Sequence, residues 1–285
     1  MPAPRLIASI DAIADEADAF LLDQFGTLHD GMVLYPGVAA ALGRLRRAGK
    51  RVIILSNSGK RAAANAERLG RLGLAPDLYD AVLTSGEVAW RLLASGARPD
   101  LAGAGRCLLL SRGADAAALE GLALRPVQDA AEADFILLLG SEADRIGLEA
   151  YRARLAPAAR RGIPCLCANP DKLMVLGSGG VAPAPGAIAA LYAEMGGPVT
   201  LIGKPGAAIY EAAFALLAPL LGGAVRRGRI WAVGDSLEHD ILGAAAQGCR
   251  SLLLLTGLAE GWEAKTLSAE MARLGIEPDA VARRM

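Results

Sequence analysis

The sequence predicts an α/β protein: a doubly wound parallel sheet that carries a second, smaller α/β module inserted into it. Short apolar runs alternate with Ala-, Leu- and Arg-rich segments of helical period, a pattern typical of a parallel sheet covered by helices on both faces. A length of 285 residues allows one domain that carries another. Polar residues follow several apolar runs, which favours a ligand site beyond the carboxyl ends of the strands.

The apolar runs predict nine strands, at 19–23, 51–56, 81–84, 107–111, 135–140, 164–168, 199–203, 229–234 and 251–255. Helical periodicity predicts seven helices between them, at 37–48, 60–72, 86–94, 148–161, 185–195, 207–218 and 239–247. The turn at 84–86 and the Gly- and Pro-rich segment 177–186 are the clearest breaks in this alternation. We therefore expect the inserted module to lie between these two breaks.

Composition limits the class of partner. The formal net charge is zero and the pI is near 6.8, so no global field attracts nucleic acid or an anionic membrane, and a small ligand is expected. We find neither a secretory leader nor an uninterrupted apolar stretch of about 18 residues, which predicts a cytoplasmic protein. The four cysteines, Cys107, Cys165, Cys167 and Cys249, are too sparse for a disulfide framework and are expected in the core.

One carboxylate follows the first predicted strand. Residues 20–31 form an apolar run that brings Asp23 to the strand end, after which the chain turns at once through Gly26 and Thr27. A second strand end carries two acids, because Asp235 follows Gly234 and Asp240 comes five residues later. Paired carboxylates suit an oxygen-ligated divalent cation such as Mg²⁺. Capping of the following helix by Asp235 is the alternative.

Two further strand ends carry groups that can bind an anion. Ser56, Asn57 and Ser58 follow an apolar strand and precede a helix, where hydroxyl, amide and backbone N–H groups can form an anion pocket, although Ser58 could simply cap the helix. Lys204 closes an apolar strand, and Pro205 prevents a helix from continuing there. A lone lysine is usually solvated, but this position favours a buried ammonium.

The order of these residues closely resembles the four motifs of the haloacid dehalogenase superfamily. Ser56 follows Asp23 by 33 residues, whereas Lys204 follows Ser56 by 148, so an inserted module fits only between the second and third motifs. This placement resembles the subclass IIA phosphatases, which carry an α/β cap there. The resemblance implies a Rossmann-like core at 1–84 and 180–285, a cap at 85–179, a small organic phosphate as substrate and, through the cap, a homodimer.

The resemblance also assigns the catalytic roles. Asp23 would be the nucleophile that forms an aspartyl-phosphate. Mg²⁺ would be held by the carboxylates of Asp23 and Asp235 and by the main-chain carbonyl of Phe25. Ser56, Asn57 and Ser58 would bind the phosphoryl oxygens, and Lys204 would offset the charge of nucleophile and phosphate. Asp240 would support Lys204 or the waters around the metal.

The sequence departs from the pattern at Phe25, where phosphatases of the family usually have a second Asp that acts as general acid. Such an acid typically contributes about 10²–10⁴-fold. Three explanations stay open: His29 or Asp30 supplies the proton, the leaving group needs none, or turnover is lost and phosphate binding is kept in a regulatory protein. The dehalogenase branch also has an aromatic here, but its cap lies between the first two motifs and it uses no metal.

Overall fold

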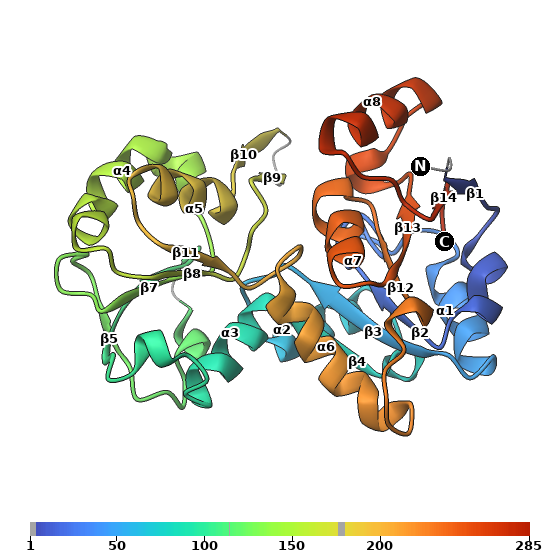
Figure 1. Ribbon diagram of the computed structural model, residues 1–285, viewed down its shortest axis with the longest axis horizontal. Coiled ribbons are helices and arrows are strands. Elements are labelled where there is room, and N and C mark those ends of the chain that lie inside the picture. Colours follow the sequence, from blue (N-terminus) through green and yellow to red (C-terminus); the bar gives the residue numbers. More distant parts are fainter. Residues whose placement is uncertain (1–3, 114, 176–179) are drawn as a thin grey trace. The chain divides into compact units, whose positions relative to one another are not determined.

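The computed structural model describes residues 4–113, 115–175 and 180–285, and the chain divides into two compact units (Figure 1). Unit 1 consists of Met1–Ser56, Ala63–Leu83 and Lys204–Met285. Unit 2 consists of Asn57–Ala62 and Thr84–Gly203. Each unit has its own sheet and its own core, so each is described separately.

Unit 1 is built on a seven-stranded sheet. In order across the sheet the strands are β1 (Arg5–Leu6), β14 (Ala280–Ala282), β13 (Arg250–Leu254), β12 (Ile230–Gly234), β2 (Ala19–Leu22), β3 (Arg51–Ser56) and β4 (Ala81–Thr84). The central pairs are parallel, with Leu22 opposite both Val233 and Ile54. The residues that follow β12, β2 and β3 therefore emerge at the same edge of the sheet, next to one another.

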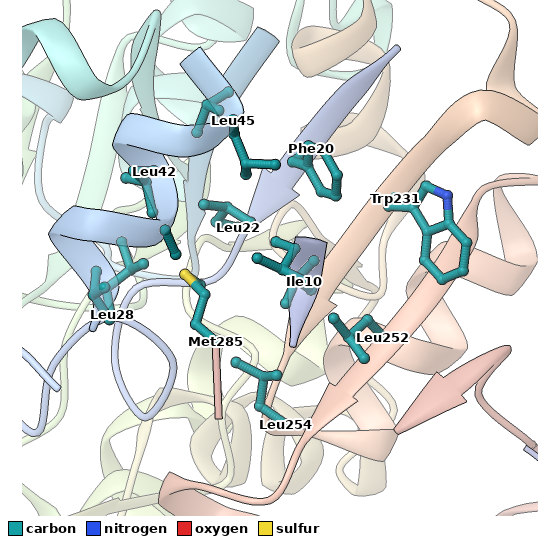
Figure 2. Packing of buried hydrophobic residues seen from close by; sticks show 14 of the residues in the cluster. Ile10, Phe20, Leu22, Leu28, Leu42, Leu45, Trp231, Leu252, Leu254 and Met285 are labelled. Carbon is teal, nitrogen blue, oxygen red and sulfur yellow. The ribbon is translucent and has the colours of Figure 1, made fainter. Parts of the chain in front are cut away.

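The helices of unit 1 are α1 (Val38–Arg47), α2 (Ala62–Arg71), α6 (Ala207–Leu220), α7 (Leu242–Ala246) and α8 (Ala264–Leu274). Shorter helical turns are η1 (Ile10–Glu16), η2 (Pro76–Leu78), η5 (Arg227–Arg229), the π-helical η6 (Leu237–Ile241) and η7 (Gly257–Ala259). Figure 2 shows side chains of α1, β2 and β13 around Ile10 and Met285 in the main core. Burial of these apolar side chains stabilises the sheet whose end carries the polar residues.

Unit 2 is built on a five-stranded parallel sheet, in the order β11 (Val199–Leu201), β8 (Cys165–Cys167), β7 (Phe135–Leu138), β5 (Arg106–Leu110) and β6 (Arg125–Val127). An antiparallel hairpin pairs β9 (Leu173–Val175) with β10 (Val181–Pro183). The helices are α3 (Ser85–Ala94), α4 (Ala143–Arg161) and α5 (Pro185–Glu194), with the turns η3 (Pro99–Leu101) and η4 (Ala116–Ala118). Buried residues of α4 and α5, such as Leu155 and Tyr192, share a core with this sheet.

The predicted fold class is confirmed: both main sheets are parallel and alternate with helices. All nine predicted strands and all seven predicted helices occur within a few residues of their expected positions, the last helix as η6 followed by α7. The prediction missed α8 and five strands, β1, β6, β9, β10 and β14. Each of these strands has only two or three residues, which is too short for an alternation pattern.

The observed division differs from the expected cap boundaries. Unit 2 continues to Gly203 rather than to residue 179, because β11 pairs with β8 and α5 packs in the core of that unit. The strand at 199–201 therefore belongs to the second sheet, and its expected place in the first sheet is wrong. Of the break at 177–186, residues 177–179 lie outside the described residues and the rest form β10 and the start of α5.

Two smaller expectations can be compared with the structure. All four cysteines are buried and free, as predicted. Burial raises the pKa of the Cys107 and Cys167 thiols to about 12, so they are inert at neutral pH. None of the helices in the described parts of the chain is long and apolar enough to span a bilayer.

Candidate active site

Asp23 lies directly after β2, in the middle of the unit 1 sheet. Its backbone N–H donates to the carbonyl of Val233 at 2.8 Å, which continues the pairing with β12 by one residue. The side chain is 12% exposed, so one carboxylate can meet a ligand while the backbone stays fixed. The fully buried run Phe20–Leu22 explains this placement, because it fixes the strand and leaves the first polar residue at its end.

Lys204 connects Asp23 with Asp240. Its Nζ donates to Asp23 Oδ1 at 2.5 Å and to Asp240 Oδ1 at 2.7 Å, and its side chain is only 3% exposed. Burial opposes the charged ammonium, but the two carboxylates outweigh burial and raise the pKa of Lys204 above its usual value. Burial raises the pKa of Asp23, and the charge of Lys204 opposes that shift. The ammonium therefore favours the ionised form of Asp23.

Asp235 completes a compact group of carboxylates. Oxygens of Asp23, Asp235 and Asp240 lie within 4.8 Å of one another. Burial, followed by the charges of Asp23 and Asp240, raises the pKa of Asp235 to about 8. Its Oδ2 accepts the backbone N–H of Leu258 at 2.6 Å. Three carboxylates beside one ammonium leave an excess of negative charge that a cation would relieve.

Two glycines make room for the Asp235 carboxylate. A Cβ at Gly26 would lie 2.1 Å from Asp235 Oδ2, and a Cβ at Gly257 would lie 2.0 Å from the same oxygen. Both glycines have positive φ, 85° and 51°, so a side chain there would also strain the backbone. The donor set is made only of oxygens and is closely packed, and it therefore fits a hard divalent cation.

Ser56 ends β3 beside β2 and is buried. Asn57 and Ser58 follow it but belong to unit 2, where Asn57 Nδ2 donates to Asp171 Oδ1 at 2.8 Å. The helix expected from residue 60 begins only at Ala62, and the Ser58 hydroxyl accepts from the N–H of Lys60 at 3.3 Å in the loop before it. Of the three predicted phosphate ligands, Ser56 ends β3, the strand that pairs with β2 and so lies beside the strand that leads to Asp23.

Phe25 and His29 lie in the loop that follows Asp23, and their rings contact each other. The Phe25 side chain is 47% exposed, and its ring meets the His29 ring edge to face at 5.8 Å between centroids. His29 is buried, and its Nδ1 accepts the N–H of Gly31 at 2.9 Å. The buried histidine ring therefore packs against the half-exposed ring of Phe25.

The contacts of His29 argue against its expected part as substitute acid. Because Nδ1 accepts a hydrogen bond, the proton of the neutral ring is on Nε2, which lies 3.1 Å from Nε2 of Gln24. With the Gln24 amide turned, its otherwise unpartnered Oε1 accepts this proton. Burial, then the charge of Arg68, lowers the pKa of His29, so the ring is neutral at pH 7.

The structure places at the site one segment that the sequence did not predict to be there. Thr256 Oγ1 donates to the carbonyl of Gly26 at 2.6 Å, and the next two residues, Gly257 and Leu258, contact Asp235. This segment follows β13 and holds the Asp23 loop and the Asp235 carboxylate together. Its only signal in the sequence is a Thr-Gly pair after an apolar run, which is common at ordinary turns.

A family model described as haloacid dehalogenase-like hydrolase matches residues 20–125, and one described as HAD-hydrolase-like matches residues 201–285. A glycerol-3-phosphate phosphatase from Gallus gallus is 30% identical over 288 residues, covering 94% of this chain and 89% of that protein. The chain belongs to the haloacid dehalogenase-like hydrolases. A D-glycerol 3-phosphate phosphatase from Mycobacterium tuberculosis is 31% identical and covers 89% of this chain and 67% of that protein.

Solved structures of this hydrolase family have the same fold. A haloacid dehalogenase-like hydrolase from Brucella suis is 28% identical with a TM-score of 0.84, covering 98% of this chain and all of the other. The Mycobacterium tuberculosis glycerol phosphate phosphatase, solved in complex with magnesium, is 29% identical with a TM-score of 0.70, covering 98% of this chain and 78% of the other. The predicted enzyme class, a phosphatase of the haloacid dehalogenase-like hydrolases, is confirmed.

Proposed function

We propose that this chain is a Mg²⁺-dependent phosphohydrolase that acts on a small organic phosphate through an aspartyl-phosphate on Asp23. The observation that carries the proposal is the buried group of Asp23, Lys204, Asp235 and Asp240, in which one ammonium orients the nucleophile. The relatives support a small substrate, since their names specify glycerol phosphates and sugar phosphates.

The first step is attack on phosphorus. Asp23 Oδ1 accepts from Lys204, which leaves Oδ2 to form the new bond to phosphorus while the bond to the leaving oxygen breaks and its electron pair departs with that oxygen. In the second step water attacks phosphorus, the bond to Asp23 breaks and the carboxylate is restored. Lys204 offsets negative charge in both steps.

A cation at this site would be held by the carboxylates of Asp23 and Asp235 and by the main-chain carbonyl of Phe25, and it would supply positive charge against the repulsion between carboxylate and phosphate. Asp240 acts through Lys204 as a positioning residue. Ser56, Asn57 and Ser58 are the proposed ligands of the phosphoryl oxygens. The expected cytoplasmic location and the homodimer stay predictions.

The absence of a carboxylate at Phe25 favours a second candidate, a phosphate-binding regulator without turnover. Hydrolysis of 4-nitrophenyl phosphate and glycerol 3-phosphate by purified protein, in EDTA and in MgCl₂, distinguishes the two. We expect metal-dependent release of phosphate that Asp23→Asn abolishes. If wild-type protein binds inorganic phosphate in calorimetry but its rate equals that of Asp23→Asn for both esters and for acetyl phosphate, the regulator is correct.

A further inference from the structure

A cavity lies on unit 1 beside the carboxylate group and separate from it. Its volume is about 990 Å³, in the upper part of the range for small-molecule sites. It opens beyond the ends of β13, β14 and β1, and the loop that leads into α8 forms its other wall (Figure 1). We call it the β14 cavity. It lies at the carboxyl ends of parallel strands, where α/β proteins bind ligands, and the residues of the carboxylate group do not line it.

Most of the lining of the β14 cavity is apolar. Leu267 and Val281 are buried residues of this lining. Trp262 and Tyr35 also line it, and both are partly exposed. Two aromatic side chains and an apolar wall favour a ligand with a hydrophobic body, because aromatic contacts add to the gain from burying apolar surface.

Four exposed charged residues line the same cavity. Arg283 and Arg284 follow β14, and Glu260 and Glu263 lie in the loop before α8. Within the parts of the chain that the structure describes, none of the four has an ion-pair partner. Their formal charges sum to zero. A ligand with charge of one sign would be attracted by one pair and repelled by the other, which lowers affinity.

From the apolar lining and the two pairs of opposite charge, we propose that the β14 cavity binds a zwitterion with a hydrophobic body, the chemistry shared by apolar amino acids and dipeptides. The carboxylate of the ligand pairs with Arg283 and Arg284, since a guanidinium group matches a carboxylate in bidentate geometry. The ammonium group donates to Glu260 and Glu263. The hydrophobic side chain packs on Trp262.

One segment connects the β14 cavity with the carboxylate group. Thr256 lines the cavity, and its Oγ1 donates to the carbonyl of Gly26 at 2.6 Å. Two residues later, the N–H of Leu258 donates to Asp235 Oδ2 at 2.6 Å. A ligand that packs against Thr256 holds this segment around Asp235 and favours the state that binds a cation, so the zwitterion acts as an effector. This effect rests on the proposed function, whereas binding of the zwitterion does not.

Tryptophan fluorescence measures binding. Trp262 lines the cavity, whereas Trp231 is fully buried and Trp90 belongs to unit 2. We would titrate wild type in EDTA with L-phenylalanine and with L-phenylalanyl-L-leucine, which distinguish the two sources of this chemistry. We expect a saturable fluorescence change that Trp262→Phe removes, while calorimetry still detects binding to that variant. Absence of saturation by both compounds up to about 10 mM would overturn the proposal.

The charges of the ligand are tested with blocked forms of whichever compound binds more tightly. Its N-acetyl form carries only the carboxylate, and its C-terminal amide carries only the ammonium. Each should bind wild type at least about tenfold more weakly than the zwitterion. Equal binding of all three forms would overturn the assignment.

Paired variants of the cavity provide the matching change in the protein. Glu260→Gln with Glu263→Gln should strengthen binding of the N-acetyl form and weaken that of the amide. Arg283→Gln with Arg284→Gln should do the reverse. Lys265→Gln is the control, because this exposed residue of α8 does not line the cavity, and it should leave the three affinities unchanged. Paired variants that bind all three forms as wild type does would also overturn the assignment.

Calorimetry of Mg²⁺ tests the connection to Asp235. Saturating zwitterion should tighten Mg²⁺ binding at least about fivefold, and Mg²⁺ should tighten zwitterion binding by the same factor. Thr256→Val should reduce this coupling, because it removes the hydrogen bond to Gly26. Equal Mg²⁺ affinity with and without zwitterion, or competition between zwitterion and inorganic phosphate, would overturn the effector role. Absence of Mg²⁺ binding would remove the proposed function, and fluorescence in EDTA would still decide whether the cavity binds the zwitterion.

Discussion

Replacing Asp235 with Asn tests how the carboxylate group controls stability. Asp235 has a pKa of about 8, because it is buried beside Asp23 and Asp240. In the metal-free protein the native state therefore holds a proton that the unfolded state has released above about pH 4. Stability contributed by this proton is complete below about pH 4 and declines as the pH rises through the native pKa near 8. Asn cannot ionise and keeps an oxygen for the N–H of Leu258.

The size of the loss in free energy of unfolding follows from the shift in the pKa of Asp235. The pKa moves from 3.8 to about 8, and each unit corresponds to about 1.4 kcal/mol, so the upper limit is about 6 kcal/mol. A bound divalent cation should cancel the loss, because it pairs with the ionised carboxylate. At 100 times its dissociation constant a ligand adds about 2.7 kcal/mol to the free energy of unfolding.

Urea unfolding at pH 5.5, 7 and 8.5, in EDTA and in MgCl₂, measures how the free energy of unfolding depends on pH and on the cation. We expect wild type in EDTA to lose several kcal/mol between pH 5.5 and 8.5, and Asp235→Asn to lose much less and to gain little from Mg²⁺. Asp77→Asn, an exposed site on unit 1, is the matched control and should behave as wild type. If metal-free wild type is as stable at pH 8.5 as at pH 5.5, or if Mg²⁺ stabilises Asp235→Asn equally, the reasoning is wrong.

Three further predictions concern the groups around Asp235. Lys204→Met should abolish turnover and lower the free energy of unfolding by about 3–5 kcal/mol at pH 7, since it leaves buried charges unpaired; a loss under 1 kcal/mol in urea unfolding would contradict this. Gly257→Ala should weaken Mg²⁺ binding in calorimetry at least about tenfold, whereas Gly261→Ala, with positive φ but open space, should not; equal affinities would refute the packing argument. His29→Ala should cost about 1–3 kcal/mol by orphaning the Gly31 amide, and a change in the aryl-to-alkyl rate ratio would instead show that His29 moves the proton.

Much of the fold and of the charge group could be predicted because both depend on local patterns. Apolar runs long enough to cross a buried sheet mark the strands, and the first polar residue after each run falls at the edge where parallel strands end. Asp23, Ser56 and Asp235 follow from this rule, since β12, β2 and β3 are neighbours. Burial of the flanking residues forces these side chains into one place.

Lys204 also follows an apolar strand, but it lies beside Asp23 for a different reason. Its preceding strand belongs to the sheet of unit 2, so the lysine does not reach Asp23 by ending a neighbouring strand of the first sheet. It reaches Asp23 because the chain enters unit 1 at that residue and because two carboxylates pair with the ammonium. Pairing between distant residues leaves no periodic signal, and the part played by Thr256 and Gly257 could not be predicted for the same reason.

In the proposed reaction, the groups that stabilise charge differ from the groups that transfer protons. Lys204 and the carboxylates fix the charge of the nucleophile, and nothing in that group depends on residue 25 having an ionisable side chain. The first half-reaction then requires only that the leaving oxygen tolerate its own negative charge. In the second, the attacking water must lose a proton, and the phosphoryl oxygens can take it, because phosphate monoanion and dianion interconvert with a pKa near 6. On the proposed function, Phe25 is therefore compatible with turnover in both halves of the reaction.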